Sequence, residues 1–396
     1  MKALRFRQYK KILFLWDVLK LALTAFGGPQ IHFTMFKKHL VSKKNYITDQ
    51  DLIEMNSFCS MLPGPTSTQT ITAIGFKLGG PLFAFITLAI WILPASLFMG
   101  TAAIVLSQMP LDSPKIAFFK YLQPMASGFM IYAAYKFIQM FVTKRYHWAL
   151  LIITAGVGIL ESSPFLIPIM LLIGGLTTSY MNTRGAVEKP KKIENIHWDK
   201  LAWFLGIFAL AAIIGVSTQS RLILLFENNF RYGSIVFGGG NALIPLMFNQ
   251  FVNYKHYMTG SEFLAGLGLL QAVPGPVFSI ASFAGAMSMK EYGVFGQILG
   301  MVSATIGIFL PGILLIFFAL PIWNQIKKFA PIYNAIEGIN ATSAGFVVVS
   351  AYLLFLPVQI NEENMLVLLG TLFLLLSTKV PTPIIVLGCL IGGYFF

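Results

Sequence analysis

Two helix-breaking segments occur twice in this chain, with the same separation each time. The first pair is Phe26-Gly27-Gly28-Pro29 and Pro63-Gly64-Pro65, and 211 residues later the chain has Phe237-Gly238-Gly239-Gly240 and Pro274-Gly275-Pro276. The register between the breaks is kept without a gap, so that Thr48, for example, matches Thr259. The chain is therefore a duplication of one unit that carries two interruptions within apolar sequence.

The composition indicates that these interruptions lie in a membrane. With 56% hydrophobic and 11% charged residues and a mean hydropathy of +0.74, the sequence has too few polar side chains to cover a soluble protein of 396 residues. The longer apolar runs are close to or above the roughly 20 residues that cross a bilayer as a helix. We predict an all-α polytopic membrane protein with helices in the apolar runs at 82–107, 118–141, 147–160, 164–181, 201–216, 293–319, 330–356, 364–377 and 382–396.

The net charge of +13 follows the positive-inside pattern of membrane proteins. The basic residues fall in separate clusters beside apolar runs and not in one continuous field. We therefore expect a multi-pass protein of the cytoplasmic (inner) membrane, with the lipid bilayer as a partner and no nucleic acid. The basic, amphipathic start predicts no cleaved signal peptide, and the two cysteines, Cys59 and Cys389, suggest neither a disulfide framework nor a metal site.

The charge pattern also favours a particular topology. If the breaks form re-entrant hairpins, Lys37, Lys38, Lys43 and Lys44 all stay cytoplasmic; if both segments span fully, these lysines lie outside, so we favour re-entry. The run 201–216 has no counterpart at the start of the first copy and adds one crossing. The second copy is then inverted, with the N-terminus cytoplasmic and the C-terminus outside. We divide the chain into a first repeat (1–183), a basic linker with an extra transmembrane helix (184–218) and a second, inverted repeat (219–396).

Each break is predicted to start a half-helix that lines a cavity, because irregular backbone is tolerated in a membrane only where protein or water covers it. A helix start presents free N–H groups and a partial positive charge, which attract anions. Hydroxyl and amide side chains follow the breaks. The expected substrate is a small inorganic oxyanion, held by Gly27, Gly28, Gln30, Gly64, Thr66, Ser67, Thr68, Gln69, Gly238, Gly239, Gly240, Asn241, Gly275 and Ser279.

Two ionisable residues in these segments are candidates to carry a coupling proton. His32 lies one turn after Pro29, and Glu54 lies on the half-helix before Pro63. Ionisable side chains are costly at membrane depth and are therefore often functional. The alternative for each is a hydrogen-bonded interfacial side chain, and the second copy has Leu243 and Ala265 at the equivalent positions.

The motifs also resemble the chromate ion transporter family, whose long members are duplicated in the same way. The resemblance covers nearly the whole chain and implies export of chromate, a tetrahedral dianion shaped like sulfate, driven by an ion gradient. Asn241 stands where a histidine is common. The matching residues are Phe26 to Pro29, His32, Phe36 to Lys38, Pro63 to Pro65, Ser67, Gln69 and Leu93 to Ser96, and in the second copy Phe237 to Asn241, Pro245-Leu246 and Ala272 to Pro276.

Other functions remain as alternatives at this point. Sulfate or another oxyanion fits the same donors, and a passive anion channel would use the same half-helix starts. A membrane enzyme would need a catalytic constellation, and the sequence has no His-Glu-x-x-His, Gly-x-Ser-x-Gly or Gly-x-x-x-x-Gly-Lys motif. We therefore expect no enzyme activity and no cofactor, and the sequence leaves homo-oligomer formation open.

Overall fold

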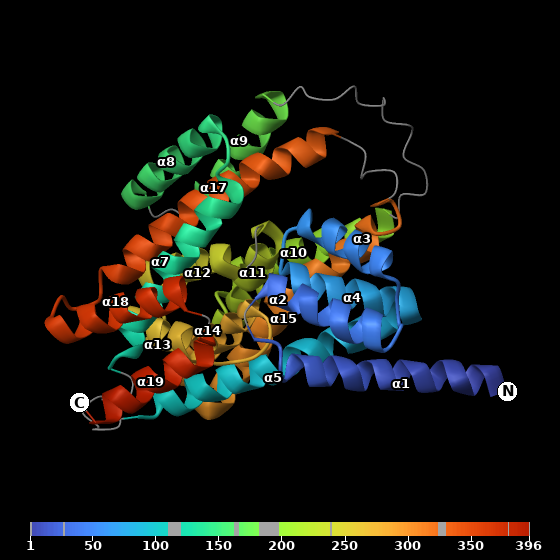
Figure 1. Ribbon diagram of the computed structural model, residues 1–396, viewed down its shortest axis with the longest axis horizontal. Coiled ribbons are helices and arrows are strands. Elements are labelled where there is room, and N and C mark those ends of the chain that lie inside the picture. Colours follow the sequence, from blue (N-terminus) through green and yellow to red (C-terminus); the bar gives the residue numbers. More distant parts are fainter. Residues whose placement is uncertain are drawn as a thin grey trace.

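The protein is a bundle of helices (Figure 1). The computed structural model describes residues 2–26, 28–109, 120–161, 166–181, 198–237, 240–323, 330–378 and 380–395, and these ranges contain no β-strand. Each of the nine predicted apolar runs is occupied by a helix over the part that is described. The prediction of an all-α membrane protein is thus confirmed. Most of the basic linker, 182–197, and Lys327-Lys328 lie outside the described residues.

The same order of elements occurs twice. The first series is α1 (Lys2–Ala22), α2 (Pro29–Phe36), η1 (Lys37–Lys43), α3 (Asp49–Ser60), α4 (Thr66–Gly79), α5 (Pro81–Ser107), α7 (Leu122–Phe141), α8 (Arg145–Leu160) and α9 (Leu166–Met181). α10 (Trp198–Thr218) follows. The second series is α11 (Arg221–Ile235), α12 (Gly240–Phe248), η2 (Asn249–Tyr254), α13 (Gly260–Leu270), η3 (Val277–Ser279), α14 (Ile280–Ser288), η4 (Lys290–Tyr292), α15 (Gly293–Ala319), α17 (Ala330–Phe355), α18 (Glu362–Ser377) and α19 (Thr382–Phe395).

The two series also match in local geometry. α3 and α13 both begin with a capping box, in which Thr48 or Thr259 accepts a hydrogen bond from the backbone N–H three residues later and the acidic side chain there bonds back. The two break glycines have nearly the same backbone angle, with φ of 116° at Gly64 and 118° at Gly275. Positive φ at these turns requires glycine. The repeated motif in the sequence therefore encodes a repeated turn.

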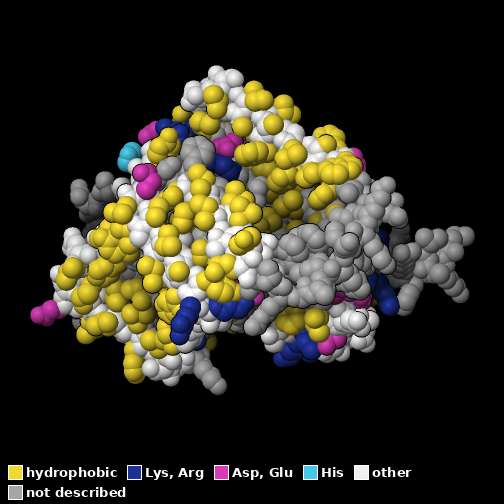
Figure 2. All heavy atoms as spheres, turned by 90° about the horizontal axis from the view of Figure 1, so that it is seen from above, with side chains coloured by type: hydrophobic (Ala, Val, Ile, Leu, Met, Phe, Trp, Pro, Cys, Tyr) yellow, Lys and Arg dark blue, Asp and Glu magenta, His cyan; other side chains and the backbone are white. Residues whose placement is uncertain are grey.

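Within the described residues, four helices are long and apolar enough to cross a membrane: Pro81–Ser107, Trp198–Thr218, Asn334–Phe355 and the helical stretch Lys290–Ala319. Large apolar side chains on their outer faces are exposed; Trp203 and Ile213 of α10 are 65% and 63% accessible. Hydrophobic side chains spread over much of the face seen in Figure 2. Such a surface suits lipid and not water.

The helices around the breaks are shorter. α3 has 12 residues and α4 has 14, which gives them lengths of about 18 and 21 Å, less than the roughly 30 Å of a bilayer core. Their ends away from the Pro63–Pro65 turn are joined by an ion pair, Lys77 to Asp51 at 2.6 Å. The equivalent pair in the second series is Lys290 to Glu262 at 2.8 Å. The Pro63–Pro65 and Pro274–Pro276 breaks therefore each lie at the uncharged end of a hairpin whose other end carries an ion pair.

The two series are interlocked. α8 and α9 of the first series pack against α17 of the second, as Figure 1 shows, and α18 and α19 pack against α7 of the first. α14 packs against α5, and α15 packs against α4. Neither series forms its packed core without helices from the other.

The breaks themselves meet through two equivalent hydrogen bonds. The N–H of Gly64 donates to the carbonyl oxygen of Val236 over 2.7 Å, and the N–H of Gly275 donates to that of Ala25 over 2.8 Å. Since Gly275 and Val236 lie 211 residues after Gly64 and Ala25, the two bonds are copies of one contact. Such reciprocal contacts are what a two-fold relation between the copies produces.

We predict that Gly275→Ala destabilises the protein more than Gly80→Ala. Both glycines have positive φ, so both variants bear a similar backbone strain of about 1–3 kcal/mol. A Cβ at Gly275 would lie only 2.9 Å from the Ala95 Cβ, whereas a Cβ at Gly80 meets no atom within 4 Å. Thermal unfolding of the purified protein in detergent measures the difference, and equal melting temperatures would contradict the close approach seen at Gly275.

Candidate functional site

The start of α4 lies inside the protein and carries most of the polar side chains predicted for the site. Ser67, Thr68 and Gln69 are all at least 95% buried. The residue before the helix is Pro65, which supplies no side-chain cap. The first N–H groups of a helix have no acceptor within it, so the amides of residues 66–68 form a partly positive end at this point.

His32 of α2 connects this helix start to the first break. Its Nε2 lies 3.1 Å from the Ala25 carbonyl oxygen, and its Nδ1 lies 2.9 Å from the Ser67 Oγ. A carbonyl only accepts, so Nε2 carries the ring proton and Nδ1 accepts from the Ser67 hydroxyl. The predicted coupling residue His32 is therefore in contact with a predicted donor. Ala25 also receives the Gly275 N–H, which links this network to the second copy.

Trp91 of α5 completes the network, although no sequence pattern pointed to it. Its indole N–H donates to the Thr68 Oγ1 over 3.1 Å, and its ring packs edge-on against His32 with centroids 5.3 Å apart. The side chain is fully buried. A buried indole N–H needs a hydrogen-bond acceptor. This requirement is the only feature that distinguishes a Trp in an apolar run from its apolar neighbours.

Gln69 lies between the Pro63–Pro65 turn and the second copy. Its Nε2 donates to the Pro63 carbonyl over 2.7 Å, and its Oε1 is buried without a hydrogen-bond partner. Gln69 also borders a cavity of about 10 Å³ that contains room for about one water. The lining comes from both copies: Pro65, Thr68, Gln69, Thr72 and Leu88 from the first, and Phe309, Gly312, Ile313 and Ile316 from the second.

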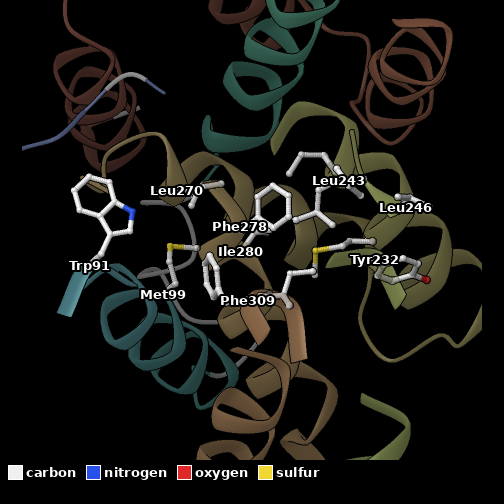
Figure 3. Close-up of a cluster of buried hydrophobic side chains, with 14 of the residues drawn as sticks. Trp91, Met99, Tyr232, Leu243, Leu246, Leu270, Phe278, Ile280 and Phe309 are labelled. Atoms are coloured by element: carbon white, nitrogen blue, oxygen red, sulfur yellow. The ribbon is translucent and has the colours of Figure 1, made fainter. Parts of the chain in front are cut away.

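The equivalent helix start in the second copy is apolar. Leu243, Phe278 and Ile280 replace His32, Ser67 and Gln69, and Figure 3 shows these three side chains within a hydrophobic cluster together with Leu270 and Phe309. Ser279 is the exception, with a fully buried Oγ that has no hydrogen-bond partner. The polar side chains are thus in the first copy, and the equivalent side chains of the second copy are mainly buried and apolar.

The remaining predicted residues are placed as follows. Gly28, with φ of 84°, precedes α2, and the backbone of Gly240 lies against Val277 of η3. Thr66 is half-buried at the start of α4. Glu54 is half-buried on α3, whereas the hydrogen bonds of His32 go to Ala25 and Ser67. Gly27, Gly238 and Gly239, and the side chains of Gln30 and Asn241, lie outside the described part of the chain.

The amides of the two break glycines have a role that the sequence did not indicate. Gly64 and Gly275 were predicted to contact an anion, and in this structure their N–H groups donate to Val236 and Ala25. The N–H groups at the start of α4 are separate from these bonds. The structure therefore brings together His32, Ser67, Thr68 and Gln69 next to a contact between the copies.

Comparison with known proteins gives the family. The family described as chromate transporter matches residues 12–179 and 223–394, and the two segments begin 211 residues apart. An uncharacterized transporter of Methanocaldococcus jannaschii is 25% identical over 95% of this chain and 92% of its own length. Chromate transport proteins include that of Pseudomonas aeruginosa, 25% identical over 83% of this chain and 77% of its own length. A probable chromate transport protein of Synechococcus elongatus is 24% identical over 96% and 93%.

No solved structure matches the chain. The family match nevertheless covers both copies of the duplicated unit, including both breaks in each. The chain is therefore a member of the chromate transporter family.

Proposed function

We propose that this protein is a secondary transporter that moves chromate, or a closely related tetrahedral oxyanion, out across the cytoplasmic membrane, coupled to an ion gradient. Membership of the family and the names of three relatives support the substrate class. The observation that carries the proposal is the buried start of α4, where hydroxyl and amide side chains surround uncapped N–H groups beside the second copy. These groups suit an oxyanion without a fixed buried cation.

The anion would lie at the start of α4, near the middle of the membrane. Backbone N–H groups and the hydroxyls of Thr66 and Thr68 are the principal donors in this proposal, and the Ser67 hydroxyl joins them when it turns from the His32 Nδ1 to the anion. Gly28, Gly240 and Ser279 would approach from the other helix starts. Gly27, Gly238 and Gly239, which lie outside the described part, and Gln30 and Asn241, whose side chains do, remain in the proposed site.

We also propose that the copies, 1–183 and 219–396, are inverted relative to one another. α10, in the segment 184–218, adds one crossing between two similar series of elements. The reciprocal bonds of Gly64 and Gly275 support a two-fold relation, and the lysine-rich ends of the first copy support a cytoplasmic N-terminus and an external C-terminus. Inverted repeats with interrupted helices are typical of secondary transporters.

Transport then requires the two copies to move against each other. A cavity of about 10 Å³ at Gln69 is too small for an anion of five heavy atoms. Its walls come from α4 and α5 of the first copy and α15 of the second, so rocking of one copy enlarges it.

We predict that Ser67→Ala combined with Gln69→Leu lowers chromate flux about tenfold or more, because hydrogen bonds to a charged group contribute about 1.5–3 kcal/mol each. The matched control is Thr305→Val on α15, which removes a hydroxyl bonded within its own helix. Flux is measured in proteoliposomes at equal protein amounts. Full flux in the double variant would place the anion elsewhere.

The transported anion and its coupling to protons are tested in everted vesicles, with and without a pH gradient across the vesicle membrane. We expect accumulation of chromate that depends on the gradient and competition from sulfate if the site reads only charge and shape. Chromate that equilibrates without ever accumulating would show a passive channel. Sulfate accumulation without chromate accumulation would change the substrate.

We predict that His32→Gln changes the pH dependence of flux more than Glu54→Gln. Glutamine keeps a donor for Ala25 and an acceptor for Ser67 but does not titrate, whereas Glu54 is outside the described network. Flux of both variants and the wild type is compared from pH 4 to 8. An unaltered profile for His32→Gln would remove His32 as the coupling residue, and an altered one for Glu54→Gln alone would assign that role to Glu54.

A further inference from the structure

A second polar cluster lies where α8 of the first copy meets α17 of the second. The Glu337 Oε2 is 2.6 Å from the Lys144 Nζ, 3.4 Å from the Tyr146 hydroxyl and 3.7 Å from the His147 Nε2. All three donors come from the first residues of α8 or the residue before it. One carboxylate thus joins the two copies through three side chains.

The geometry fixes the proton of the His147 ring. Its Nδ1 lies 3.3 Å from the backbone N–H groups of Thr143 and of Lys144, and accepts from both. The neutral ring therefore carries its proton on Nε2, on the side of Glu337. His147 is 98% buried and Nε2 has no hydrogen-bond partner. A proton added at Nδ1 would break the cap of α8, so the carboxylate of Glu337 is the group that can take up a proton here.

A cavity of about 240 Å³ adjoins this cluster. Glu337, His147 and Asn340 are on its wall, and so are Ser60 and Met61, which immediately precede the Pro63–Pro65 turn. The volume is far above the roughly 10–15 Å³ that one water requires. The cavity is large enough for an anion and lies beside the half-helix that ends at the first copy's second break.

The residue of the first copy that is equivalent to Glu337 lies just before α7 and carries the opposite charge. Lys120 lies 217 residues before Glu337, the offset that relates this part of the two copies, and pairs with Glu363 at 2.6 Å. Tyr121 also donates to Glu363 over 3.1 Å. Both ends therefore have an ion pair between the copies, but of these four charged residues only Glu337 lines the cavity described above.

We propose that Glu337, Lys144 and His147 form a proton-linked capture site for the transported oxyanion, a proposal that rests on the proposed function. The ionised Glu337 carboxylate forms an ion pair with the Lys144 ammonium and repels an anion. A proton taken up by the Glu337 carboxylate cancels its charge. An anion at the cavity wall can then take its place beside the His147 Nε2–H, which lines the cavity, and beside the Lys144 ammonium and the Tyr146 hydroxyl, which lie behind Glu337. Proton and anion therefore bind together.

Other titratable groups on the elements packed against α17 are few among the described residues. α7 contributes Tyr132, Tyr135 and Lys136, whose Nζ lies 5.6 and 5.8 Å from the two ring centroids. α9 contributes Tyr180, which is exposed, and the described side chains of α12 include no titratable group. α8 carries Arg145, whose side chain is exposed, beside the Tyr146 and His147 that contact Glu337.

The test is calorimetric binding of chromate to the full-length protein in detergent at pH 8, in two buffers of different ionisation enthalpy. We expect the wild type to take up protons on binding. E337Q should bind chromate about five- to tenfold more tightly with less proton uptake, as expected for removal of one partly exposed competing pair. K144M/E337Q should lose the gain. E363Q is the matched control and should change affinity less than about twofold.

Unaltered proton uptake in E337Q, or a gain in affinity that persists in K144M/E337Q, would overturn the capture site. Melting temperatures show whether each variant is folded. E337D keeps the negative charge and should bind chromate with the affinity and proton uptake of the wild type. If the wild type binds chromate without proton uptake, only this inference fails. If the wild type neither binds nor transports chromate, the proposed function fails first.

Discussion

The fold depends on how two interrupted segments satisfy their backbone within a membrane. An unpaired amide or carbonyl facing lipid costs several kcal/mol, so an interruption needs a partner other than water. Here each copy supplies it for the other: Gly64 donates to Val236, and Gly275 donates to Ala25. The breaks are therefore stable as a pair, and the same contact brings helix starts from both copies to one place.

This arrangement gives the two copies different tasks. In the first, His32 is hydrogen-bonded to Ser67 and Trp91 donates to Thr68 at the start of α4. In the second, Leu243 and Phe278 stand at equivalent positions and pack. Duplication supplied the symmetric frame, and divergence of side chains at matched positions made one half polar and the other apolar. The proposed anion site is asymmetric for this reason.

The sequence predicted what is encoded locally. Repeated Gly and Pro segments marked the breaks, and apolar runs marked the helices α5, α7 to α10, α15 and α17 to α19, because turn geometry and membrane burial act over short stretches. Contacts between distant segments were not predictable in this way. Trp91 was missed because its partner, Thr68, is 23 residues away on another helix. The use of the Gly64 amide by the opposite copy and the pairing of Glu337 with Lys144 likewise depend on packing that no local pattern records.

The claim on which the account depends is that the copies are oppositely oriented, and side-specific thiol labelling tests it most directly. Ser42 and Asn253 are exposed, equivalent residues in η1 and η2, and each is replaced by cysteine in a chain whose Cys59 and Cys389 are changed to alanine. An impermeant maleimide added to intact cells should label cysteine 253 only, and added to everted vesicles should label cysteine 42 only. Labelling of both positions from the same side would contradict the inverted arrangement and the central anion site built on it.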